Sequence, residues 1–81
     1  MNLYLISQNV NTGWDTYQSA VVSAKNENEA KSIHPRFGLN WNGENVSRSG
    51  WSSIEDVEVQ LIGETSLYNT PTIIITDFKN G

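Results

Sequence analysis

The sequence contains no cysteine and only one histidine among its 81 residues. Without cysteine there are no disulfides and no thiolate chemistry, so the chain is suited to a reducing compartment. A single histidine leaves little from which to build a zinc site, and the acidic residues lack the spacing of a calcium-binding loop. We therefore expect neither a bound metal nor a cofactor.

Long apolar runs and clusters of basic residues are also missing. No stretch approaches the roughly 18 apolar residues of a membrane span, and the opening MNLYLISQ lacks the basic region of a signal peptide. Five Lys and Arg stand against nine Asp and Glu, which gives a net charge of -4. This balance argues against non-specific binding to nucleic acid and against membrane binding, because both need clustered positive charge. We expect a cytoplasmic protein.

The composition is that of a folded protein, with 37% apolar, 10% aromatic and 17% charged residues. A chain of this length forms one domain, residues 1–81, and buries roughly 60% of its extended surface. The resulting core is small and leaves little stability to spare. Self-association would add buried surface, so we expect a homodimer or a higher oligomer.

Four segments are rich in strand-forming residues: LYLISQNV (3–10), TYQSAVVSA (16–24), VEVQLIG (57–63) and TIIITDF (72–78). The first two flank the turn-forming NTG, which predicts an antiparallel hairpin. GETSLYNTP is expected to join the last two as a longer hairpin loop. The continuous apolar run of 72–78 predicts a strand that is covered on both faces or lies in a subunit contact.

Between the second and third strands, NENEAKSI predicts a short helix. Asn26 can cap it, and Glu29 completes an imperfect capping box three residues later. Ala30 and Ile33 would face the sheet, and Pro35 ends the helix because it disfavours helical backbone at the preceding residue. The predicted fold class is α+β, a small antiparallel sheet in the order β-β-α-β-β with the helix packed across it.

Residues 34–56, HPRFGLNWNGENVSRSGWSSIED, form the least regular part of the sequence. Only SSIED suggests local order, as one helical turn capped by Ser52 or Ser53. A loop of about 20 residues in a compact domain indicates a functional segment, disorder, or a missed element such as a strand around LNWNG. Its large aromatic residues argue against disorder, because such side chains need burial or a partner.

The run LYLISQNVNTGWDTYQSAVVSAKNENEAKSIHP, with VEVQLIGE and IIITDFKNG further on, resembles a family of small phage and prophage accessory proteins. The resemblance covers most of the chain and implies an origin in a phage or mobile element, without implying a particular activity. Residues matching the family pattern are Asp15, Tyr17, Ser19, His34, Pro35, Trp51, Gly63 and Glu64.

This chain departs from the family pattern at two positions, with Trp14 where Tyr is usual and Gln18 where Asp is usual. The loss of the second acid puts a mechanism with paired carboxylates in doubt. Asp15, His34 and a serine could in principle form a catalytic triad, yet no nucleophile-elbow pattern surrounds any serine. Since His34 at a helix end also has a structural explanation, we expect the protein not to be an enzyme.

Aromatic and arginine residues gather in the predicted loops, and such side chains stack on planar ligands and anchor protein interfaces. Some have a structural alternative, because Tyr17 and Trp51 could close the core and Asp15 could cap a turn or pair with Arg36 or Arg48. Trp41, among polar neighbours, is the strongest candidate for an external contact. The predicted binding residues are Trp14, Asp15, Tyr17, His34, Arg36, Trp41, Arg48 and Trp51.

Together these features predict a non-enzymatic counter-defence protein, encoded by a phage, that binds and blocks a component of a bacterial immune system in the host cytoplasm. One alternative is a sponge that sequesters an immune-signalling nucleotide at the interfaces of an oligomer. A small enzyme using His34 is a second alternative, and a structural accessory without a ligand is a third.

Overall fold

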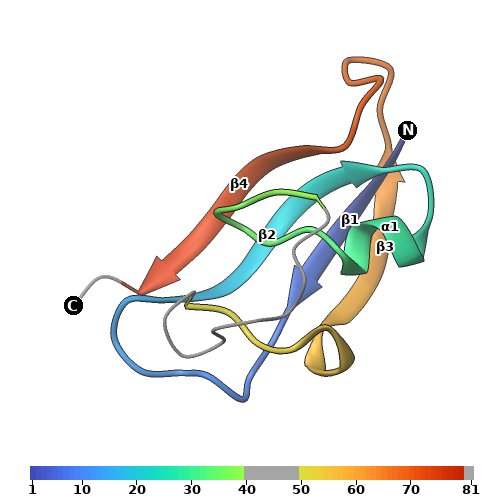
Figure 1. The fold of residues 1–81 in the computed structure, drawn as a ribbon. Helices are drawn as coiled ribbons and strands as arrows, with labels where there is room; N and C mark the ends of the chain where they lie inside the picture. The colour runs from blue at the N-terminus through green and yellow to red at the C-terminus, as the bar shows by residue number, and fades with distance from the viewer. Residues whose placement is uncertain (40–49, 80–81) are drawn as a thin grey trace.

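The computed structural model describes residues 1–39 and 50–79. It contains a four-stranded antiparallel sheet in the order β3-β1-β2-β4, one short α-helix and one 3-10 turn (Figure 1). The elements are β1 (Asn2–Ser7), β2 (Thr16–Ala24), α1 (Glu27–Lys31), η1 (Ile54–Asp56), β3 (Glu58–Glu64) and β4 (Thr72–Lys79). The sheet dominates, and the expected α+β character rests on α1 and η1. Within the described residues no helix is long and apolar enough to cross a membrane.

The predicted hairpin of the first two strands is confirmed, with Leu5 of β1 opposite Val21 of β2. β2 has the predicted bounds, whereas β1 ends at Ser7 instead of continuing to Val10. The early end has a physical cause, because the side chain of Gln8 hydrogen-bonds to backbone groups of the following loop.

The predicted hairpin of the last two strands is wrong. β3 pairs with β1 and β4 pairs with β2, so the two strands occupy opposite edges of the sheet. The segment 65–71 passes the end of the sheet and is fixed to both central strands. The Thr65 N–H donates to the Met1 carbonyl at 2.8 Å, and the Ser23 hydroxyl donates to the Thr70 carbonyl at 3.1 Å.

β4 is also not covered on both faces. It is an edge strand on which Ile74 and Ile75 are exposed, the latter by 63% of its surface. The other half of the sequence prediction, a subunit contact for this strand, remains a prediction.

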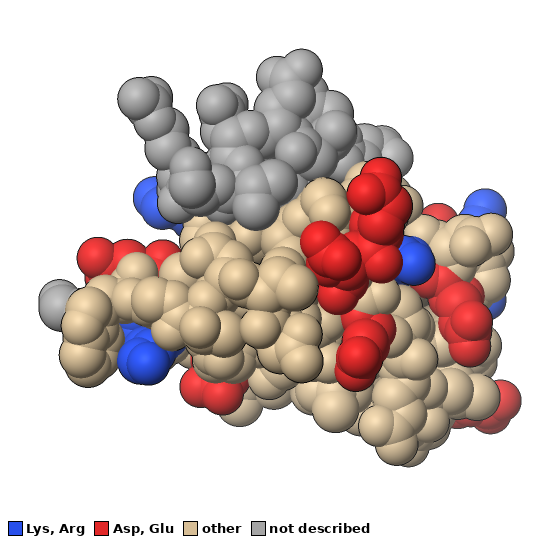
Figure 2. All heavy atoms as spheres, turned by 90° about the horizontal axis from the view of Figure 1, so that it is seen from below, with Lys and Arg blue, Asp and Glu red and all other residues tan. Residues whose placement is uncertain are grey.

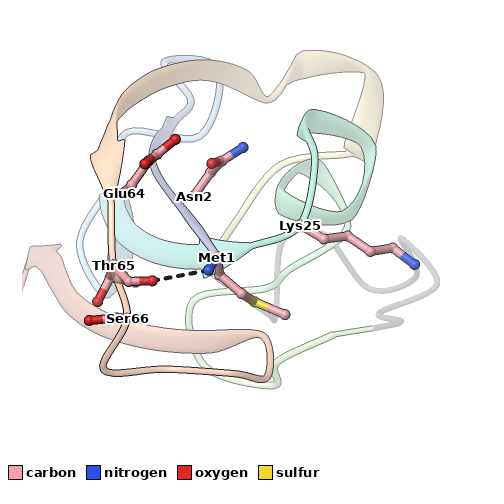
Figure 3. A pocket seen from close by; sticks show the side chains of 6 residues that line it. All are labelled: Met1, Asn2, Lys25, Glu64, Thr65 and Ser66. Carbon is pink, nitrogen blue, oxygen red and sulfur yellow. Dashed lines mark hydrogen bonds between the residues drawn. The ribbon is translucent and has the colours of Figure 1, made fainter.

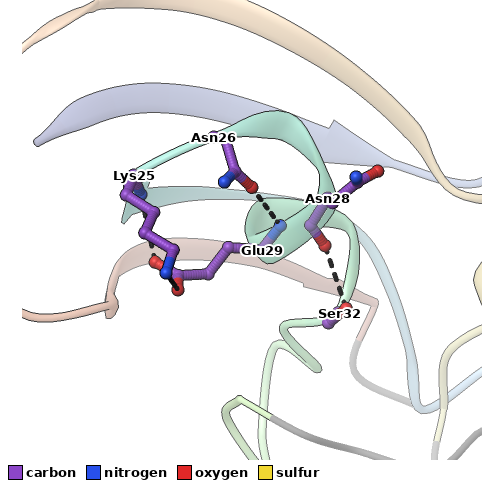
Figure 4. A network of polar contacts seen from close by, with 5 residues as sticks. All are labelled: Lys25, Asn26, Asn28, Glu29 and Ser32. Carbon is purple, nitrogen blue, oxygen red and sulfur yellow. Dashed lines mark hydrogen bonds and ion pairs between the residues drawn. The ribbon is translucent and has the colours of Figure 1, made fainter.

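Helix α1 begins as predicted, with the Asn26 side chain accepting a hydrogen bond from the Glu29 N–H at 2.8 Å (Figure 4). The Glu29 carboxylate reaches back to the Lys25 N–H at 3.0 Å, one residue beyond a regular capping box, and pairs with the Lys25 ammonium at 3.9 Å. At the other end, the Ser32 hydroxyl donates to the Asn28 carbonyl. These local bonds hold a helix of only five residues.

The core lies between one face of the sheet, α1 and the segment that returns through Trp51. Ala30 and Ile33 face this core as predicted, and Trp51 is 1% exposed, so its side chain fills the protein's own interior. The buried apolar residues are Tyr4, Ile6, Ala20, Val22, Ala24, Ala30, Ile33, Trp51 and Val57. Each large side chain in such a position contributes about 1.5–3 kcal/mol.

The predicted helical turn in SSIED is confirmed as η1, but its serine cap differs from the prediction. Ser53 occupies the N-cap position, and its hydroxyl donates to the Asp56 carboxylate at 2.9 Å without bonding the turn's backbone. The Ser52 hydroxyl donates to the Ser53 carbonyl.

Candidate functional site

The loop between β1 and β2 is built around the buried side chain of Gln8. Its Oε1 accepts hydrogen bonds from the Val10 and Asn11 N–H groups at 3.0 and 2.8 Å. Its Nε2 donates to the carbonyls of Asn11 and Tyr17 at 2.7 and 2.8 Å. The amide thus replaces the strand pairing that stops at Ser7 and gives residues 8–15 a defined shape.

Trp14 lies at the end of this loop and is 70% exposed. The following residue, Asp15, has a left-handed backbone with φ 59°, and its N–H donates to the Lys79 carbonyl at 2.6 Å. The Lys79 ammonium lies 5.0 Å from the centre of the Trp14 ring, within the range of a cation–π contact. The loop therefore presents an indole ring and a cation together to solvent.

A second loop is organised by the fully buried His34. Its Nδ1 accepts hydrogen bonds from the N–H groups of Arg36 and Phe37 at 2.9 and 3.2 Å. His34 and Gly38 also exchange both backbone hydrogen bonds, each at 2.9 Å, and Gly38 takes the left-handed φ of 83° that closes the loop. Because Nδ1 accepts, the proton of the neutral ring lies on Nε2. His34 is thus the frame on which Arg36 and Phe37 are displayed.

Ring contacts connect the two loops through Tyr17. The Tyr17 ring lies 4.6 Å from that of Phe78 and 6.2 Å, edge-on, from that of His34. The His34 ring is in turn 4.5 Å from Phe37. Offset and edge-on pairs of this kind add about 0.5–1.5 kcal/mol each beyond the area they bury.

The exposed members of this cluster form what we call the aromatic strip: Trp14, Phe37, Phe78, Arg36 and Lys79. Phe37 is 57% and Phe78 41% exposed. The guanidinium of Arg36 lies 5.6 Å from the centre of the Phe37 ring, which parallels the pairing of Lys79 with Trp14. The strip therefore has a cation against an exposed ring at each of its two ends.

Neither cation is neutralised within the described residues. Among residues 1–39 and 50–79 the one ion pair joins Lys25 and Glu29, away from the strip. The Lys79 ammonium instead donates to the Thr12 carbonyl at 3.4 Å. Figure 2 looks onto this end of the molecule, where acidic side chains gather over one side and a broad uncharged area lies beside them.

The structure brings together five of the eight predicted binding residues, namely Trp14, Asp15, Tyr17, His34 and Arg36. Trp51 is near them, with its ring 6.4 Å from that of His34, but it belongs to the core. The other two, Trp41 and Arg48, lie outside the described residues.

Sequence reasoning missed three members of the strip: Phe37, Phe78 and Lys79. In the sequence, Phe37 is one of several aromatic residues in an irregular segment. Phe78 lies directly opposite Tyr17 in the β2–β4 pairing, and the incorrect β3–β4 hairpin hid this neighbour. The signal available in the sequence was the Phe-Lys pair at the end of the last predicted strand, which in the structure lies beside the NTGW turn.

The geometry gives no support to the alternative of an enzyme using His34. Its side chain is fully buried, and its Nδ1 already receives two backbone N–H groups. A general base must reach the proton it abstracts, directly or through one water molecule. In the described part of the chain, no three His, Asp or Glu side chains are grouped so that they could hold a metal ion.

A cavity of about 660 Å³ is at the other end of the sheet, where β1 begins and β3 ends (Figure 3). It is polar and is lined by Met1, Asn2, Lys25, Glu64, Thr65 and Ser66. Figure 3 shows Lys25 extending away from Glu64, so the two charges do not converge on one point. It also contains no aromatic residue, and ligand pockets usually combine apolar walls with a few convergent polar groups. The aromatic strip is the stronger candidate site.

Fold and site together define a small antiparallel-sheet domain that displays aromatic and basic side chains at one end. Comparison with known proteins finds no match to a family model, a curated protein or a solved structure.

Proposed function

We propose that this protein is a non-enzymatic counter-defence protein, encoded by a phage, that acts as an inhibitor by binding a component of a bacterial immune system. The phage origin rests on the LYLISQ, DTYQSAVV and IHP segments of the sequence. The binding role rests on one observation, the aromatic strip with its two cations. The site of action that follows is the host cytoplasm.

Exposed rings next to cations are the side chains that dominate binding energy in protein interfaces. A typical interface engages 20–30 residues on each side, which is a large part of so small a surface. The partner would therefore cover the whole end of the sheet. Because Arg36 and Lys79 form no ion pair with another described residue, they are available to acidic groups on the surface that docks there.

The strip is also held in place before binding. Gln8 fixes the loop that carries Trp14, and His34 fixes the turn that carries Arg36 and Phe37. Ordering loops and side chains on association costs free energy, so a preformed surface retains more of its contact energy as affinity. This favours a blocking protein that docks as a rigid body.

A nucleotide sponge is the second candidate, because the same two cation–ring pairs could stack on a base and contact a phosphate. The described residues form no enclosed aromatic pocket at the strip. This candidate therefore needs an oligomer that brings two strips together around the ligand.

The test compares Trp14→Ala and Phe37→Ala with Leu67→Ala, which removes a still more exposed apolar residue from the loop at the far end. The readout is the plating of defence-sensitive phages on a panel of bacteria, each carrying one defence system and expressing one variant. The wild type and Leu67→Ala should restore plating on the same strain. Each strip variant should weaken binding by about 2 kcal/mol, roughly 30-fold, and reduce plating accordingly. Full activity of both strip variants, with unchanged circular dichroism, would contradict the proposal.

Mass spectrometry separates the two candidates. The purified protein is incubated with lysate from the responsive strain and recovered, with the Trp14→Ala variant as the control. A protein that binds the wild type and not the variant supports the blocker, whereas a small molecule with that behaviour supports the sponge. Recovery of neither would argue against both.

A further inference from the structure

The free edge of β4 is the least protected part of the sheet. Its Ile74 and Ile75 are exposed, and the strand carries no charge from Thr72 to Thr76. An edge strand presents unpaired N–H and C=O groups, and proteins usually guard it with charges, proline or a short length. β4 is eight residues long and has none of these guards over its first five residues.

The apolar surface continues from this edge across the outer face of the sheet, opposite α1. Leu5, Val21 and Ile75 occupy directly adjacent positions on β1, β2 and β4. Leu3 lies beyond Leu5 on the same face, because side chains two residues apart on a strand point to the same side. A shallow cavity of about 150 Å³ lies among Leu5, Val21 and Ile75. Leu3, Leu5 and Val21 are half-buried in this row, and Ile75 at its β4 end is exposed.

The opposite edge, β3, is guarded by like charges. It runs from Glu58 to Glu64 with Leu61 at its centre, and both acids are exposed. If β3 paired antiparallel with β3 of a second copy over its full length, Glu58 of each copy would stand opposite Glu64 of the other. Like charges directly opposite each other destabilise a strand pair. An irregularity in the β1–β3 register adds a second obstacle to regular pairing at this edge.

β4 carries no such pair of like charges, although its pairing with β2 also contains register shifts, one of them next to Ile75. In an antiparallel pair centred on Ile75, that residue meets Ile75 of the second copy, and Asp77 stands opposite Ile73. No like charges face each other, and Asp77 is the strand's only acid. Ile75 and Asp77 lie on the outer face with Val21 and Ser19, whereas the register shift between Val21 and Val22 places Ile73 on the core side with Val22.

We propose that β4 pairs with β4 of a second copy about a two-fold axis through Ile75, which forms a dimer with one continuous sheet. The pairing satisfies the free backbone groups of β4 and joins the two apolar rows at their exposed ends. It goes beyond the proposed function and does not depend on it: the strip shares Phe78 and Lys79 with β4, but Trp14 and Phe37, whose variants test that function, lie outside the strand. Closed two-fold symmetry also uses up both β4 edges and prevents further growth.

The first test is the solution mass of the full chain by light scattering at tens of micromolar. The wild type should have twice the 9.1 kDa mass of one chain. Ile75→Lys should be a monomer, whereas Ile62→Lys, which places the same charge on an exposed isoleucine of β3, should remain a dimer. Trp14→Ala should also remain a dimer, which keeps this result separate from the proposed function. A monomeric wild type would overturn the inference.

The second test uses the absence of cysteine, which makes any introduced thiol unique. Directly opposite residues of an antiparallel pair have Cα atoms about 4.5–5.5 Å apart, within the range of a disulfide. Ile75→Cys should therefore form a cross-linked dimer on mild oxidation, and Ile62→Cys should not. Equal cross-linking of both variants, or cross-linking of Ile62→Cys alone, would overturn the inference. This readout also covers the case in which Ile75→Lys fails to fold.

Discussion

Asp15, Gly38 and Gly50 have left-handed backbone conformations, with φ of 59°, 83° and 73°. Gly50 is the most constrained of them, because a Cβ atom there would lie 2.7 Å from the Asp15 carbonyl oxygen. Its own carbonyl accepts a hydrogen bond from the Tyr17 N–H at 2.7 Å. Residue 50 thus fixes the returning chain against the start of β2, beside the aromatic strip.

Gly50→Ala should lower the free energy of unfolding by about 2–4 kcal/mol, because left-handed backbone strain and a steric clash add together. The matched control is Gly13→Ala, since Gly13 has open space around its Cα and no positive φ. That variant should change stability by less than about 1 kcal/mol. Urea denaturation of both variants gives the comparison, and equal losses would show that the contact at Gly50 does not matter.

Single residues were predictable where the cause is local. Asn26 caps α1 through a bond to a residue three positions away, and Ala30 and Ile33 follow the helical spacing. The role of His34 was not predictable in this way. Its ring is buried by segments distant in sequence, although its acceptor bonds to Arg36 and Phe37 are local.

At the scale of elements, β2 has the predicted bounds because turn-forming residues and a helix cap delimit it on either side. The edge position of β4 could not be read in the same way. A hairpin prediction assumes that consecutive strands pair, whereas here the 65–71 loop passes both central strands before β4 begins. The placement of Phe78 beside Tyr17 follows from that strand order and was lost with it.

The β1–β2 loop is the element that depends most on one side chain. Gln8→Ala removes all four hydrogen bonds of the amide and leaves the backbone groups of Val10, Asn11 and Tyr17 without their partner. The expected loss of stability is about 2–6 kcal/mol, since each of these four part-buried hydrogen bonds contributes about 0.5–1.5 kcal/mol net. Thermal denaturation of this variant provides the measurement.

The matched control is Gln18→Ala, which removes a half-buried glutamine whose Nε2 makes one bond, to the Thr16 hydroxyl at 3.2 Å. Its stability should fall by no more than about 1 kcal/mol. Amide resonances of residues 9–15 should shift in Gln8→Ala and not in the control. An unperturbed loop in Gln8→Ala would show that other contacts define its shape.

At the scale of the whole molecule, the sheet has two ends and two edges that differ in chemistry. One end displays the aromatic strip, and the other holds the polar cavity around Lys25 and Glu64. One edge, β3, carries Glu58 and Glu64, and the other, β4, is uncharged from Thr72 to Thr76. The two proposed surfaces meet at Phe78 and Lys79, which belong both to β4 and to the aromatic strip, whereas Trp14, Arg36 and Phe37 lie outside β4.

Hydrogen exchange of the whole chain shows which edge of the sheet is covered by a second copy. Amides of the central strands β1 and β2 should exchange most slowly, because both of their sides are paired within one chain. At high protein concentration, the outward-facing amides of β4 should also be protected, and dilution or Ile75→Lys should remove that protection. The outward-facing amides of β3 serve as the internal control and should exchange quickly throughout. Protection of β3 in place of β4 would mean that copies associate through the acidic edge, and the charge pattern of Glu58 and Glu64 would then have no role in choosing the interface.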